Sequence, residues 1–182
     1  DFHKILELVD EFRHSGLVKI AFGSLGPGTI DEAQIKNIVM LANEIQAPIQ
    51  TVASQMGKES RRRTKEPDQH WLSLLETLGM LGPNLQIVHL SDSTKPLLDI
   101  IKKTGSTVIH CPSEKMKHAK GQYQLEPLWE QGIPLGLGTG GADSNTSFNL
   151  FNEAHIAILL ERFEYQNSVA KAPKNLIRMI TL

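Results

Sequence analysis

Two histidines have the side chain and the position in sequence that metal binding or proton transfer needs. His89 is the penultimate residue of the apolar run LQIVHL (85–90), and His110 stands near the end of the run STVIHC (106–111). Neutral imidazole is a common zinc ligand and a good general base. If the two runs are neighbouring strands, the rings could approach one another. The alternative is that one or both rings are buried and bonded to backbone, and the residues leave both interpretations open.

A third stretch, IPLGLGTGGADSN (133–145), is rich in glycine. Backbone N–H groups in such a loop can hold a phosphate group. The stretch nevertheless matches neither common phosphate-binding pattern, because no lysine follows the glycines and no helix begins directly after Gly141. The favoured interpretation is a strand end at which small residues allow close backbone approach.

The remaining candidate groups are few. Glu153 and His155 are two residues apart, a spacing that places them on different sides of a helix, so they are not expected to act as a pair. Cys111 is the single cysteine, which excludes an internal disulfide and a cysteine metal cluster and fits a reducing cytoplasm.

The elements that would position these residues alternate along the chain between helical and strand patterns. Apolar runs predict strands at 17–22, 48–53, 85–90, 106–111 and 133–138. Helical periodicity and stop signals predict helices near 3–15, from the capping pattern 29–32 to an end before Pro48, near 70–81, 96–103, 124–131 and 148–164, and from Pro173 onward. This alternation predicts an α/β fold with a parallel sheet and right-handed crossovers. The strand-to-helix loops at 23–28, 54–69, 91–95, 112–122 and 139–147 would then build any site.

Composition narrows the class of protein further. The chain has 182 residues, enough for one domain, and a net charge of −1, which gives no reason to expect nucleic acid or an anionic membrane as partner. It has no apolar span of about 20 residues and no signal peptide pattern. It opens in a helical pattern and ends on LIRMITL, so we interpret it as a piece of something longer.

Several stretches together resemble the amidohydrolase superfamily, in particular the chlorohydrolase and aminohydrolase branch that includes methylthioadenosine/S-adenosylhomocysteine deaminases. The resemblance is carried by VHL (88–90), by 105–145 with its HCP and GLGTGGADSN motifs, and by LFNEAHIAILLE (150–161). APIQTVASQMGKE (47–59) and APKNLIRMITL (172–182) are also similar to that branch.

The resemblance implies a fold. The family fold is a (β/α)8 barrel, usually with a small β-sandwich, and a complete barrel typically needs about 250 residues. By this comparison, residues 1–182 form one partial TIM barrel domain of about five βα units, corresponding to strands four to eight. The first three strands, with their His-x-His metal pair, and the sandwich are expected to be absent.

The resemblance also implies roles for individual positions. His89 stands at the family's metal-binding histidine of the sixth strand, and His110, Ser113 and Glu114 stand at the substrate-binding stretch after the seventh. Three other family positions are substituted. The expected metal histidine of the fifth strand is Val52, the catalytic glutamate three residues later is Gln55, and the aspartate of the eighth strand is Gly140.

By resemblance the activity is metal-dependent hydrolysis of a C–N or C–Cl bond on a purine- or triazine-like ring, with zinc or iron as cofactor. A catalytic zinc normally has three protein ligands, so His89 alone is not expected to hold an ion. Asp143, three residues beyond Gly140, is the nearest substitute carboxylate, but the loop disfavours it. We therefore expect a family member without bound metal and without turnover.

The alternative is a module without catalysis. It would bind a small heterocyclic amine, or it would complete a barrel with a second copy or a partner chain at the open sheet edges.

Overall fold

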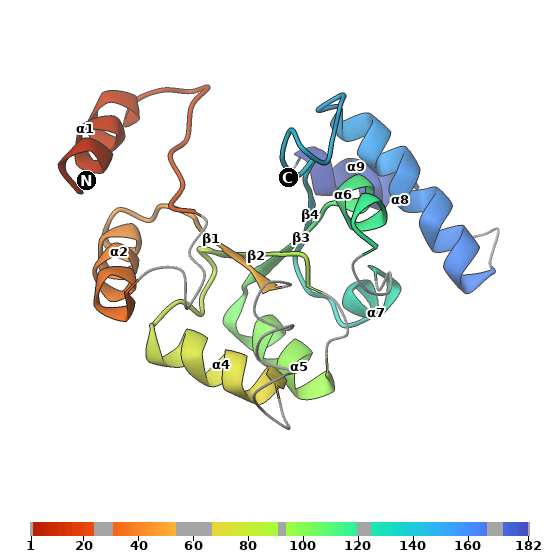
Figure 1. The fold of residues 1–182 in the computed structure, drawn as a ribbon, viewed down its shortest axis with the longest axis horizontal. Coiled ribbons are helices and arrows are strands. Elements are labelled where there is room, and N and C mark those ends of the chain that lie inside the picture. Colours follow the sequence, from red (N-terminus) through yellow and green to blue (C-terminus); the bar gives the residue numbers. More distant parts are fainter. Residues whose placement is uncertain are drawn as a thin grey trace.

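The computed structural model describes residues 2–23, 31–53, 67–90, 94–119, 125–166 and 173–181. Its centre is a four-stranded sheet in the order β1-β2-β3-β4, with every pair parallel (Figure 1). The strands are β1 (Ile49–Val52), β2 (Leu85–Val88), β3 (Thr107–His110) and β4 (Leu135–Leu137). The predicted α/β class with a parallel sheet is confirmed.

The pairing register brings the carboxyl ends of the strands to one edge of the sheet. Val52 pairs with Val88, Val88 with Ile109, and Ile109 with Gly136. The residues that follow these positions, His89 and His110 among them, therefore emerge side by side at this edge.

The predicted first strand at 17–22 is wrong over most of its length. Only Phe22 pairs, through an isolated parallel bridge to Ile49. The N–H of Phe22 donates to the carbonyl of Pro48 at 2.8 Å, and the N–H of Gln50 donates to the carbonyl of Phe22 at 2.7 Å. Leu17 is 99% exposed and Val18 is also exposed, so the start of this run does not pack against the sheet, whereas Phe22 at its end is buried in the core.

Helices follow the strands as the alternation predicts. They are α1 (Phe2–Phe12), α2 (Glu32–Glu44), α4 (Pro67–Thr77), α5 (Lys95–Thr104), α6 (Pro112–Lys117), α7 (Leu125–Glu130), α8 (Leu150–Tyr165) and α9 (Pro173–Thr181). Helix α6 is a correction, because residues 112–122 were expected to form a loop. It begins with Pro112, which suits the first helical turn, but it is too short to show apolar periodicity.

Helix α5 illustrates how local sequence sets the element boundaries. Proline stands in its first turn, lysines stand in its last turn where the helix dipole favours cations, and Gly105 ends it with φ 73. Its buried face consists of Leu97, Leu98 and Ile101.

The helices lie in an arc around the sheet, from α2 through α4 and α5 to α7, with α8 and α9 beside β4 (Figure 1). Two apolar clusters hold them there. The larger includes Ile35, Leu75, Leu85, Ile87 and Ile101, and the smaller includes Leu137, Ala157, Ile158, Leu176 and Met179. Leu135 of β4 packs against both clusters, which couples the two parts of the sheet. Among the described helices, none is both long and apolar enough to cross a membrane.

Candidate functional site

His89 directly follows β2 and has an unusual backbone conformation. Its φ is 61, in the left-handed region that residues with a Cβ seldom adopt, and such strain costs on the order of 1–3 kcal/mol. Its N–H donates to the carbonyl of Ile109 at 3.4 Å, which keeps the residue attached to β3. The residue is 8% exposed. The surrounding structure therefore holds a buried imidazole in a costly conformation at the strand ends.

Glu114 faces this imidazole. Its Oε1 lies 2.9 Å from Nε2 of His89, and both side chains are largely buried. Glu114 is in the first turn of α6, which begins immediately after β3. The early start of this short helix is what carries the carboxylate back over the neighbouring strand end.

Gly140 lies next to the same carboxylate. Its φ is 70, and a Cβ at this position would overlap Oε2 of Glu114 and lie 3.1 Å from the Cβ and Cδ of that residue. The carboxylate of Glu114 thus fills the volume that a side chain on residue 140 would need.

Cys111 is the third donor at this place. Its Sγ, a ring nitrogen of His89 and a carboxylate oxygen of Glu114 all lie within 4.8 Å of one another. Burial, and to a lesser degree the charge of Glu114, raises the pKa of the Cys111 thiol to about 12, although backbone hydrogen bonds from Gly140 and Gly138 act in the opposite direction. The thiol is therefore protonated at neutral pH.

His110 is the last residue of β3, and its Nε2 atom is buried. Burial, together with the smaller effects of the positive charge of Lys115 and of the neighbouring His89, lowers the pKa of His110 to about 3. The two strand-end histidines therefore lie near one another, as one of the two sequence interpretations expects. His110 is a neutral imidazole at physiological pH.

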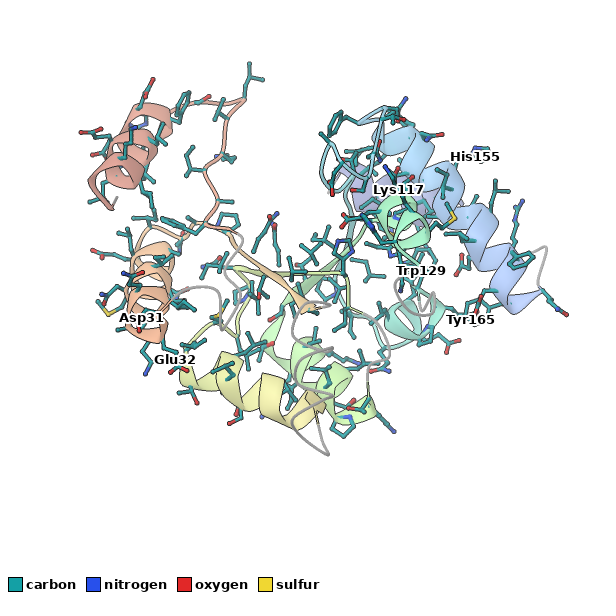
Figure 2. The ribbon with its side chains drawn as sticks, viewed as in Figure 1. Asp31, Glu32, Lys117, Trp129, His155 and Tyr165 are labelled. Atoms are coloured by element: carbon teal, nitrogen blue, oxygen red, sulfur yellow. The ribbon has the colours of Figure 1, made fainter. Side chains whose placement is uncertain are left out.

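The buried carboxylate of Glu153 connects α8 to α6 through hydrogen bonds. Glu153 is 0% exposed and accepts three hydrogen bonds, from the N–H of Ser113 at 3.0 Å, from the Ser113 hydroxyl at 2.5 Å and from Nδ2 of Asn145 at 2.6 Å. His155, two residues further along α8, is exposed and lies on the outer side of the helix (Figure 2). The prediction that Glu153 and His155 do not form a pair is confirmed.

The loop 139–147 is fixed by its own hydrogen bonds. Asn145 Oδ1 accepts from the N–H groups of Ser147 and Phe148, each at 3.0 Å. The N–H groups of Ser144 and Asn145 both donate to the carbonyl of Gly141, and Lys117 of α6 donates to the carbonyl of Asp143. Because several of these N–H groups already donate within the loop, the arrangement disfavours a phosphate cradle.

Some of the site residues predicted from the sequence lie close together in the structure, and others do not. His89 and Glu114 are in contact, and His110 is close to them. Ser113 is used in bonding Glu153, and the exposed Asp143 is not part of the donor group. Val52 ends β1 opposite Val88, and Gln55 lies outside the described residues.

Two residues of this site were missed by sequence reasoning. The sequence relates Cys111 to disulfides, cysteine clusters and the HCP motif, and it relates Glu153 to His155 and to the family stretch 150–161, but it assigns neither residue a role in a site. The sequence signal for Glu153 was available, because a carboxylate at a position flanked by apolar residues of a helix needs hydrogen-bond donors.

Comparison with known proteins identifies a family. The model of the amidohydrolase family matches residues 2–182. The 5-methylthioadenosine/S-adenosylhomocysteine deaminase of Saccharophagus degradans is 34% identical over 180 residues, which are 99% of this chain and 40% of that protein. The deaminase of the same name from Teredinibacter turnerae is 30% identical over 99% of this chain and 41% of its own length. The chain thus spans about 40% of the length of these curated relatives.

Solved structures agree in fold. An adenosine deaminase from Xanthomonas campestris with bound zinc superposes with a TM-score of 0.86 and 26% identity, over 99% of this chain and 41% of that one. The atrazine chlorohydrolase of Arthrobacter aurescens complexed with zinc gives a TM-score of 0.83 at 20% identity, over 98% of this chain and 40% of that one. The second likeness bears on the fold alone.

Proposed function

The chain belongs to the amidohydrolase family, and on that premise we propose that it forms part of a barrel descended from metal-dependent hydrolases of purine- or triazine-like rings, with an incomplete hydrolytic centre. The ring class is supported by relatives named for the deamination of methylthioadenosine, S-adenosylhomocysteine and adenosine. The zinc bound to the adenosine deaminase from Xanthomonas campestris supports a divalent metal as the cofactor of the lineage.

One observation carries the proposal. The carboxylate of Glu114 fills the space beside Gly140 and contacts Nε2 of His89 at 2.9 Å. By resemblance, an aspartate at position 140 would accept the proton of the attacking water, and His89 would hold the metal. Here Glu114 faces His89 instead. In addition, Val52 and Gly140 have no side-chain donor atom. The side chains present therefore do not fit the family's arrangement of metal ligands.

The proposal predicts that hydrolysis is absent. The purified chain should be incubated with Zn²⁺ or Fe²⁺ and with adenosine, 5-methylthioadenosine, S-adenosylhomocysteine or atrazine, while released ammonia or chloride is measured. We expect no release above the uncatalysed rate, with the deaminase of Saccharophagus degradans as positive control. Turnover near the typical enzyme value of about 10 s⁻¹ would show that the centre is complete.

We further propose that the strand-end site binds a small heterocyclic amine. The support is chemical: the carboxylate of Glu114 can accept from ring or exocyclic N–H groups, and neutral His110 can accept or donate. Calorimetric titration with adenosine should show saturable binding that His110→Ala weakens by about tenfold. Unchanged affinity in that variant would remove His110 from the site.

A second candidate function is assembly, and the open sheet favours it. Among the described residues, β4 has a strand neighbour only on the β3 side, and β1 has beyond it only the Phe22 bridge. Unpaired parallel edges invite pairing with another chain. Light scattering on the purified chain should then report a dimer or larger species, whereas a monomer at high concentration would contradict this function.

A cytoplasmic location is the setting we propose, since the single cysteine is a buried free thiol.

A further inference from the structure

We propose that His89, Cys111 and Glu114 together form a binding site for a zinc-like divalent cation. Two of these three donors stand at positions to which the resemblance assigns no metal. The proposal goes beyond the proposed function, because it concerns ion binding and requires neither ring binding nor hydrolysis.

The geometry of the donors supports the site. One donor atom from each residue lies within 4.8 Å of the other two. In a tetrahedral zinc site with bonds of about 2.0–2.3 Å, donor atoms are separated by roughly 3.3–3.8 Å. Nε2 of His89 and Oε1 of Glu114, which are 2.9 Å apart, would move slightly apart around an ion. Sγ of Cys111, which lies within 4.8 Å of the other two donor atoms, would need to move closer by at most roughly 1.5 Å.

The chemistry of the donors also suits zinc. Imidazole nitrogen, cysteine sulfur and carboxylate oxygen are the three donor types that zinc takes in proteins. On binding, the Cys111 thiol gives up its proton to solvent, so that one thiolate and one carboxylate balance the two charges of the ion. The positive charge of nearby Lys115 opposes binding, but His110 is neutral and adds no further charge.

The surrounding backbone makes room for these donors. The Cβ of any residue at position 140 would overlap the Glu114 carboxylate, and a Cβ at position 138 would lie 3.0 Å from Sγ of Cys111. Glycine at both positions is therefore what admits the thiol and the carboxylate. Gly140, where the resemblance expects an aspartate, leaves space for the carboxylate of Glu114 from helix α6.

The donors are also held before any ion arrives. His89 is fixed in the left-handed conformation next to β3, and Cys111 is 2% exposed at the end of that strand. Glu114 is carried by α6, whose first turn is bonded to Glu153 through Ser113. Ligands that are already ordered lose little conformational freedom on binding, which favours affinity.

Cobalt titration tests the site directly. The full chain, freed of metal with a chelator, should bind about one equivalent of Co²⁺ and develop the intense near-ultraviolet absorption of a cobalt–thiolate bond. Zn²⁺ should displace the cobalt and abolish this absorption. Cys111→Ser should lose the absorption, and Glu114→Gln should weaken binding by about tenfold or more. His155→Asn, which removes an exposed imidazole of α8, should change neither result.

Three results would overturn the proposal. They are the absence of thiolate absorption in the wild-type chain, its persistence in Cys111→Ser, and unchanged affinity in Glu114→Gln. If a variant fails to fold, X-ray absorption of the zinc-loaded wild-type chain decides instead. One sulfur neighbour among nitrogen and oxygen neighbours supports the site, and a shell without sulfur refutes it.

Discussion

Gly140 and Glu114 compete for one small volume, and this contact is open to a double-mutant test. Gly140→Ala should destabilise the chain, since the new Cβ adopts a left-handed conformation at a cost of about 1–2 kcal/mol and also displaces the carboxylate from His89. In a Glu114→Ala background only the conformational cost should remain.

The measurement for this pair is the free energy of unfolding of the four proteins in urea. We expect a coupling energy of about 0.5–3 kcal/mol between the two positions. Additive effects would mean that the carboxylate does not occupy the space beside residue 140.

Cys111 gives a second prediction at this scale. Because the thiol is buried and its pKa is raised to about 12, it should react slowly with a disulfide reagent in the native chain and rapidly in denaturant. The reaction is followed by released chromophore, and Cys111→Ser gives the background. Native reactivity equal to that of the unfolded chain would contradict the buried placement.

Between elements, Glu153 is a buried polar connection that joins α8 to the first turn of α6 and to Asn145. Glu153→Gln keeps the size of the side chain but turns an N–H donor toward groups that are themselves donors. We expect a loss of about 2–4 kcal/mol in unfolding free energy, because a buried hydrogen-bond network is broken.

The matched control for this change is Glu164→Gln, which alters an exposed glutamate of the same helix. It should shift stability by no more than about 0.5 kcal/mol. Equal effects of the two variants in denaturant titrations would show that the Glu153 network contributes nothing special.

The sequence predicted some elements much better than others, and the reasons are physical. The runs at 85–90 and 106–111 became β2 and β3, whose residues are buried or half-buried, which suits largely apolar sequence. The run at 17–22 has similar composition, but strand formation depends on a partner that composition does not reveal. Helix α6 escaped prediction because six residues give less than two turns of periodicity.

The candidate site shows a similar division. From the resemblance alone, an aspartate is expected at the position of Gly140. The sequence could not predict that Glu114 fills the space beside Gly140, because this depends on the start of α6 and on the left-handed φ of His89, two features of backbone geometry without a distinct sequence pattern.

For the molecule as a whole, His110 predicts acid sensitivity. Its pKa is lowered in the folded state, so the unfolded chain binds the proton more readily below the ordinary value of 6.5. The neutral His110 ring therefore leaves the free energy of unfolding at its full value above about pH 6.5. As the pH falls from about 6.5 toward about 3, this free energy decreases by up to about 1.4 kcal/mol per pH unit.

The urea concentration at the unfolding midpoint should therefore decrease as the pH is lowered from about 7 to about 4. His110→Gln should make this decrease smaller. His118→Gln, which changes an exposed histidine, should reproduce the wild-type slope. Parallel profiles for wild type and His110→Gln would show that His110 takes up its proton equally well in the folded chain.

Because Phe22 forms only an isolated bridge, we expect the first helix to open more often than the strands of the sheet. Two backbone hydrogen bonds at Phe22, together with the packing of Ile5 and Val9, attach the first helix to the sheet. Amide deuterium exchange should therefore be fast in Phe2–Phe12 under conditions in which Leu85–Val88 exchanges only through global unfolding. Such a segment can detach and return many times during the lifetime of the folded remainder, and equal protection of both segments would refute this.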